Sequence, residues 1–151
     1  MKLTLGRKYS FEMEFLGYQF PALANTPYDS NWLNVRIDVR HPLGEWSAVD
    51  PALLTYEVKS LADWLRNLAA GRRDERCMDF MEPCLVFSCI SSDDSTEALK
   101  IEFSHEFRPP WLNRNQEDEF EMVFPLAKID LIEAAEALER NLARYPQRTS
   151  L

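Results

Sequence analysis

The stretch NWLNVRIDVRHPLGEWSAVDPALLTYEVKSLADWLRNL, residues 31–68, contains the patterns that decide the fold class. Apolar and polar residues first alternate, which places every second side chain on the buried face of a strand: Leu33, Val35, Ile37 and Val39. The sequence His41-Pro42-Leu43-Gly44 is typical of a tight turn, so residues 45–49 can return as the antiparallel partner. The apolar spacing then changes to three and four, which predicts an amphipathic helix with this buried stripe: Leu54, Val58, Leu61, Leu65 and Leu68.

A polar loop precedes the first of these strands. We expect Asp29, Ser30 and Asn31 to hydrogen-bond the backbone and to shape the turn that leads into the strand. Trp32 falls by alternation on the face opposite Leu33. It therefore either covers the outer side of the sheet or contacts a partner protein, since tryptophan is enriched at interfaces.

The same patterns recur along the rest of the chain. Alternation predicts strands at residues 11–15, 84–90, 99–107 and 120–124, and a second helical stripe includes Leu131, Ala135, Leu138, Leu142 and Tyr145. Strands joined by short turns, without a repeated βαβ unit, favour an α+β fold. The prediction is an antiparallel β-sheet of about six to eight strands with two amphipathic helices packed on its apolar side. A chain of 151 residues suits a single domain, residues 1–151.

Composition places the chain among ordinary globular proteins, with 46% hydrophobic and 28% charged residues. The amino-terminal residues lack the apolar run of a signal peptide, which predicts a cytoplasmic protein without a membrane association. Cys77, Cys84 and Cys89 are an odd number without a Cys-x-x-Cys pair, as expected for free thiols in a reducing compartment.

The net charge of −8 is unevenly distributed. Residues 93–139 contain thirteen acids and four bases, a net charge of −9. Such a segment repels nucleic acid and attracts basic protein surfaces, although a solubilising acidic face has the same composition. We therefore predict a basic protein partner, and the candidate partner-binding residues are Asp93, Asp94, Glu117, Asp118, Glu119 and Glu121, together with Trp32.

No catalytic motif is present. The chain has neither a Gly-x-Ser-x-Gly elbow nor a glycine-rich phosphate loop, and the two histidines, His41 and His105, belong to no zinc-ligand spacing. Alternation predicts His105 on the apolar face of the strand at residues 99–107. The sequence thus predicts no catalytic residue, no metal site and no cofactor.

Four segments resemble the WapI family of bacterial immunity proteins: FLGYQFP at residues 15–21, NWLNVRIDV at 31–39, GEW at 44–46 and PALLTYEVKSLADWLRNL at 51–68. The resemblance spans roughly residues 11–68 and concerns strand, turn and helix patterns, so it implies a fold more directly than an activity. It implies a small cytoplasmic protein that binds the toxic carboxyl-terminal domain of a polymorphic toxin; some of these toxins are tRNA-cutting nucleases.

The leading hypothesis is a non-enzymatic immunity-type protein that binds and neutralises a cognate, basic toxin domain. The alternative is a small-ligand binding module or an unrecognised enzyme, in which residues 28–32 and a neighbouring strand form a pocket. A deep cavity with converging polar groups would favour that alternative. The sequence leaves the oligomeric state open.

Overall fold

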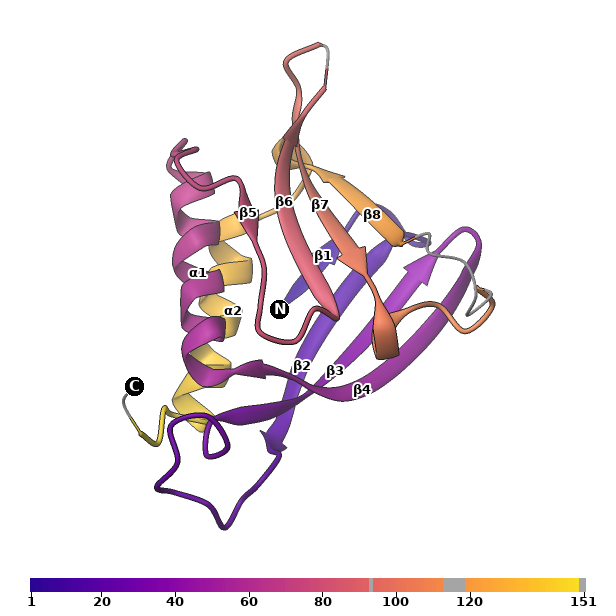
Figure 1. The fold of residues 1–151 in the computed structure, drawn as a ribbon. Helices are drawn as coiled ribbons and strands as arrows, with labels where there is room; N and C mark the ends of the chain where they lie inside the picture. The colour runs from indigo at the N-terminus through magenta and orange to yellow at the C-terminus, as the bar shows by residue number, and fades with distance from the viewer. Residues whose placement is uncertain (93, 113–118, 150–151) are drawn as a thin grey trace.

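The computed structural model describes residues 1–92, 94–112 and 119–149, and Figure 1 shows their path as two sheets and a pair of helices. The elements in chain order are β1 (Lys2–Thr4), β2 (Ser10–Tyr18), β3 (Trp32–His41), β4 (Gly44–Leu54), α1 (Thr55–Ala69), β5 (Cys77–Met78), β6 (Leu85–Ser91), β7 (Glu97–Phe103), the 3-10 helix η1 (His105–Phe107), β8 (Phe120–Pro125), the 3-10 helix η2 (Leu126–Lys128) and α2 (Leu131–Arg144). The α+β class is confirmed.

The first sheet contains the predicted hairpin. Its antiparallel strand order is β1-β2-β3-β4, and the turn between β3 and β4 closes where His41 pairs with Gly44. The four apolar residues predicted on the inner face of β3 are each at most 2% exposed: Leu33, Val35, Ile37 and Val39. β4 continues through Pro51 to Leu54, so α1 begins at Thr55.

The second sheet has the antiparallel order β5-β6-β7-β8. The predicted hairpin of residues 84–107 is present, but β7 ends at Phe103. The prediction that His105 lies on the apolar face of this strand is therefore wrong. His105 is exposed and has a φ of +49°, which interrupts the extended backbone and starts η1.

The strands form two sheets, where the sequence indicated one. α1 separates β4 from β5 along the chain, and each group of four strands has one apolar face. These two faces bury each other: the ring centroid of Phe11 in β2 lies 6.0 Å from that of Phe87 and 5.7 Å from that of Phe103. One hydrophobic cluster includes residues from both sheets and both helices.

The two helices lie side by side along one side of the sheets (Figure 1). α1 buries four of the five residues of its predicted stripe and Trp64, whereas the fifth, Leu54, is buried at the end of β4. The side chain of Asp130 caps α2 by accepting a hydrogen bond from the Glu133 backbone at 2.9 Å. Within the described residues, neither helix has the length and apolar character needed to cross a membrane.

Candidate partner-binding surface

The structure shows three of the six acidic residues predicted to contact a partner, and all three are exposed. Asp94 lies in the turn between β6 and β7, Glu119 directly precedes β8, and Glu121 lies in β8. Asp93, Glu117 and Asp118 lie outside the described residues. Trp32, the remaining candidate, is half-buried at the start of β3, where it pairs with Leu54 of β4.

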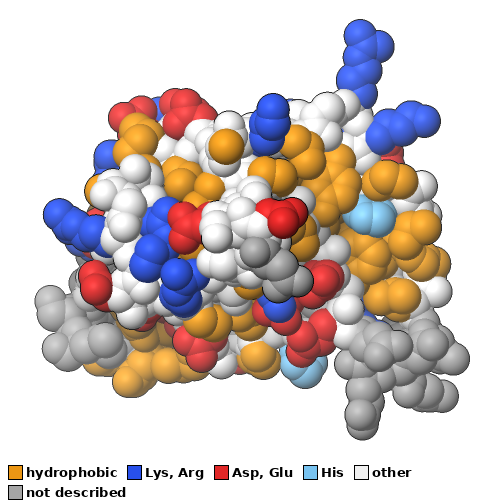
Figure 2. Space-filling view, turned by 90° about the horizontal axis from the view of Figure 1, so that it is seen from above, with side chains coloured by type: hydrophobic (Ala, Val, Ile, Leu, Met, Phe, Trp, Pro, Cys, Tyr) orange, Lys and Arg blue, Asp and Glu red, His pale blue; other side chains and the backbone are white. Residues whose placement is uncertain are grey.

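Many carboxylates of the acid-rich segment are paired with bases. Arg73 binds both carboxylate oxygens of Glu97, with a distance of 2.7 Å between its Nε and Oε1. Other pairs in this segment are Arg66–Glu139 at 2.7 Å, Lys100–Glu102 at 3.0 Å and Arg140–Glu133 at 2.6 Å. Figure 2 shows acidic and basic side chains interspersed on one face of the molecule. The net charge of −9 counted along residues 93–139 is therefore partly offset by arginines from other segments.

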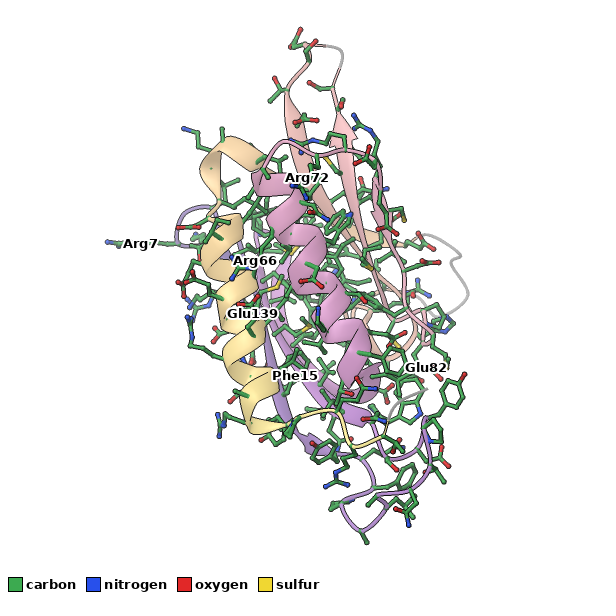
Figure 3. The ribbon with its side chains drawn as sticks, turned by 90° about the vertical axis from the view of Figure 1, so that its left-hand side faces the viewer. Arg7, Phe15, Arg66, Arg72, Glu82 and Glu139 are labelled. Carbon is green, nitrogen blue, oxygen red and sulfur yellow. The ribbon has the colours of Figure 1, made fainter. Side chains whose placement is uncertain are left out.

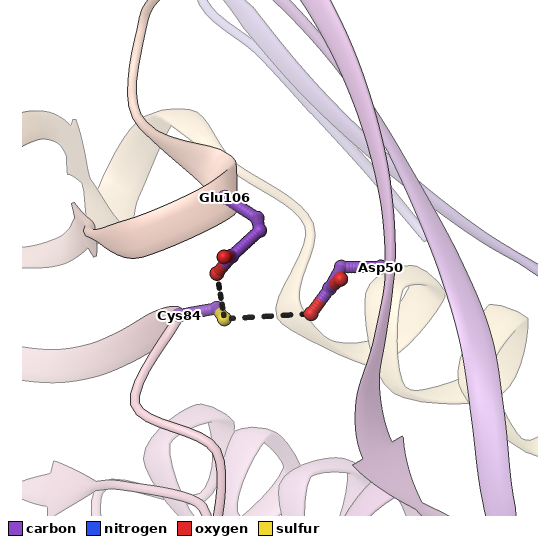
Figure 4. A group of neighbouring side chains, drawn as sticks. All are labelled: Asp50, Cys84 and Glu106. Carbon is purple, nitrogen blue, oxygen red and sulfur yellow. Dashed lines mark hydrogen bonds between the residues drawn. The ribbon is translucent and has the colours of Figure 1, made fainter.

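A different group of acidic side chains surrounds Cys84, just before β6. The Cys84 sulfur lies 3.9 Å from a carboxylate oxygen of Asp50 and 3.9 Å from one of Glu106 (Figure 4). Burial raises the pKa of the Cys84 thiol to about 12, and the charges of Asp50, Glu106 and Glu82 also act in this direction. Burial also raises the pKa of Asp50, and Glu106 and Glu82 raise it further.

The raised pKa values of Cys84 and Asp50 indicate what chemistry the group of Asp50, Cys84 and Glu106 can perform. A thiol with such a pKa is protonated near neutral pH, so Cys84 lacks the thiolate that a nucleophile requires. Ligand atoms of Asp50, Cys84 and Glu106 lie within 4.8 Å of one another, close enough to hold a metal ion. Sequence spacing did not indicate this group, because its members come from β4, the segment before β6 and η1.

Glu57 connects the first turn of α1 to the segment before β6. Its carboxylate accepts one hydrogen bond from the Leu54 backbone at 2.8 Å and one from the Met81 backbone at 2.7 Å. Burial raises the pKa of Glu57, and the nearby charges of Glu82 and Asp79 raise it further. Glu82 lies at the end of the molecule where α1 begins (Figure 3). Acidic side chains therefore gather beside the start of this helix.

Asn31 organises the loop between β2 and β3, residues 19–31. This asparagine is fully buried, and its amide donates a hydrogen bond to the Pro27 carbonyl at 2.7 Å. Its side-chain oxygen accepts from the Thr55 hydroxyl and from the Arg148 backbone, both at 2.9 Å. The side-chain oxygen of Ser30 accepts from the Thr26 backbone at 2.9 Å. The prediction that Ser30 and Asn31 shape this turn is confirmed.

The carboxyl-terminal tail, residues 145–149, binds the β2–β3 loop through hydrogen bonds to its backbone. The guanidinium of Arg148 lies 3.5 Å from the ring centroid of Tyr18 and donates hydrogen bonds to three loop carbonyls, those of Phe20, Pro21 and Leu23, at 3.2, 3.0 and 2.6 Å. The Thr149 hydroxyl donates to the carbonyl of Ala24 at 3.2 Å. Residues more than a hundred positions away thus help to hold the loop in its conformation.

Three large apolar side chains of this loop remain exposed. Phe20 and Leu23 are each 40% exposed and Tyr28 is 47% exposed. Phe20 and Leu23 lie in one turn, where the Leu23 backbone donates a hydrogen bond to the Phe20 carbonyl at 3.1 Å. Exposed apolar side chains on one loop are a feature of protein interaction sites. The sequence predicted the loop but not its contacts with the tail. A hydrogen bond between residues more than a hundred positions apart leaves no local pattern in the sequence.

Comparison with known proteins gives one match. A family model described as the immunity protein WapI-like family matches residues 2–146. No curated protein and no solved structure matches significantly. The resemblance seen at residues 11–68 therefore extends over nearly the whole chain.

Proposed function

This chain belongs to the immunity protein WapI-like family, and we propose from this membership that it is a non-enzymatic protein that binds and neutralises the toxic domain of a cognate toxin. The match over residues 2–146 is the observation that carries the proposal. The burial of Cys84 supports it, because burial raises the pKa of this thiol to about 12 and so disfavours the thiolate that a cysteine enzyme uses.

We further propose that the toxin domain is basic and that the two proteins meet in the cytoplasm. The net charge of −8 supports a basic partner. Exposed carboxylates at Asp94, Glu119 and Glu121 would increase the association rate, because long-range attraction guides the encounter before contact. Asp93, Glu117 and Asp118 would contribute to the same field.

Co-expression tests the proposed function. The probe is the carboxyl-terminal domain of a polymorphic toxin encoded next to this protein's gene. Expression of that domain alone should stop growth, and co-expression of this protein should restore it. An inactivated toxin domain should co-purify with this protein. Toxicity that persists despite equal expression of both proteins would contradict the proposal.

The electrostatic part has a separate test. The association rate should be measured at low ionic strength for the wild-type protein and for a variant with Glu117→Gln, Asp118→Asn, Glu119→Gln and Glu121→Gln. We expect slower association of the variant at low salt and convergence of the two rates as salt rises, because salt screens exposed charges. Equal association rates at low salt would show that this segment does not guide the encounter.

A further inference from the structure

Resting on the proposed function, we infer that the basic toxin domain docks at the end of the molecule formed by the β2–β3 loop and the first turn of α1. Phe20, Leu23 and Tyr28 would supply the apolar contacts, and Glu82 would face basic side chains of the toxin. Both elements lie at the same end of the molecule (Figure 1). The binding site would thus combine a central apolar patch with an acidic edge.

The first argument is the rigidity of the loop. Arg148 binds three of its carbonyls, Thr149 binds a fourth, and Asn31 joins it to both the tail and α1. These contacts satisfy backbone groups on one side of the loop while the Phe20, Leu23 and Tyr28 side chains remain exposed. A loop already held in one conformation loses little entropy on binding, so its apolar side chains can contribute most of their burial energy to affinity.

The second argument is the continuity between the loop and the acidic side chains. Asn31 accepts a hydrogen bond from the hydroxyl of Thr55, the first residue of α1. The next residue along α1 is Tyr56. Burial raises the pKa of Tyr56, and the neighbouring Glu57 and the loop residue Tyr28 raise this pKa further. Glu57 in turn binds the backbone of Met81, which is 54% exposed and directly precedes Glu82.

The third argument is charge complementarity. Asp79 and Glu82 are exposed and flank the Met81 region whose backbone donates a hydrogen bond to Glu57 at 2.7 Å, and the charges of both act to raise the pKa of Glu57. Among the described residues, no lysine, arginine or histidine forms an ion pair within 4.0 Å with Glu57, Asp79 or Glu82. By contrast, Glu97 and Glu139 in the acid-rich segment are each bound by an arginine. An acidic surface without its own cations beside an apolar patch matches a basic protein partner.

The test measures binding of the inactivated toxin domain to Leu23→Ala, Tyr28→Ala and Glu82→Gln variants by surface plasmon resonance. Leu43→Ala is the matched control, because Leu43 is 70% exposed in the turn at the opposite end of β3. We expect each apolar variant to raise Kd roughly tenfold, mainly through faster dissociation. Glu82→Gln should mainly slow association at low salt.

Thermal melts of each variant establish that it is folded; exposed side chains contribute little to stability. Wild-type Kd values for both loop variants would overturn the docking surface, and so would an equal loss in Leu43→Ala. In either case the wild-type protein still binds, so the proposed function stands. Failure of the wild-type protein to bind the toxin domain would instead overturn the proposed function and this surface together.

Discussion

Substitution of Asn31 by alanine should destabilise the protein strongly, because this residue joins three parts of the chain. The change removes the acceptor for the Thr55 hydroxyl and the Arg148 backbone, and the amide that donates to the Pro27 carbonyl and, at 3.4 Å, to the Thr149 carbonyl. The three hydrogen bonds shorter than 3.0 Å, at about 1 kcal/mol each, amount to roughly 3 kcal/mol. Thr55 is 1% exposed, so its hydroxyl loses its acceptor in a buried position, which adds at least about 1 kcal/mol.

The expected loss in the free energy of unfolding is therefore about 4 kcal/mol, which corresponds to a fall in Tm of roughly 8–16 °C for a chain of this length. Urea denaturation followed by circular dichroism measures the loss. Hydrogen exchange should also become faster in the β2–β3 loop and in the tail, because Asn31 holds both. The matched control is Asn34→Ala, the same chemical change at a half-buried position of β3. A loss below about 1 kcal/mol for Asn31→Ala would refute this account of the hydrogen bonds.

Three further predictions concern other parts of the molecule. Iodoacetamide at pH 8 should label the exposed Cys77 in the folded protein and leave Cys84 unmodified until denaturant is added, as measured by mass spectrometry; rapid labelling of native Cys84 would contradict its pKa of about 12. Asp50→Asn should raise the free energy of unfolding at pH 7, because the folded protein raises the pKa of Asp50 and so disfavours its charged form. That gain should shrink as the pH falls through the folded-state pKa of Asp50, where the wild-type carboxyl is already protonated; a constant gain in pH-dependent denaturation would contradict it. Gly44→Ala should cost about 1–3 kcal/mol, because the new Cβ would lie 2.7 Å from the Trp111 ring at a φ of +151°. Gly6→Ala, at a φ of +78° but with no atom within 4 Å, should cost less in the same thermal melt.

Local periodicity was sufficient to predict most of the secondary structure. Alternation of side chains across a strand depends only on neighbouring residues, so the inner face of β3 could be identified from Leu33 to Val39. The stripe in α1 could be identified for the same reason. The end of β7 could not, because the positive φ of His105 interrupts an alternation that continues in the sequence to Phe107.

The candidate binding surface was less predictable. Net charge along the chain drew attention to residues 93–139, where arginines from α1 and the following loop neutralise Glu139 and Glu97. The exposed loop residues Phe20 and Leu23 carry no charge and belong to no catalytic or ligand-binding motif. The sequence does not show that these side chains stay exposed on a loop that the tail binds.

The amino-acid sequence by itself determined the strand and helix patterns, the α+β class and the likeness to WapI-like immunity proteins, because each depends on residues that are close together in the chain. Tertiary structure alone decided that the strands form two sheets, that Asp50 and Glu106 meet at Cys84, and that Arg148 holds residues 20–23. These contacts join segments separated by many residues. Their partners are selected by the pairing of strands and the packing of helices, which no local pattern specifies.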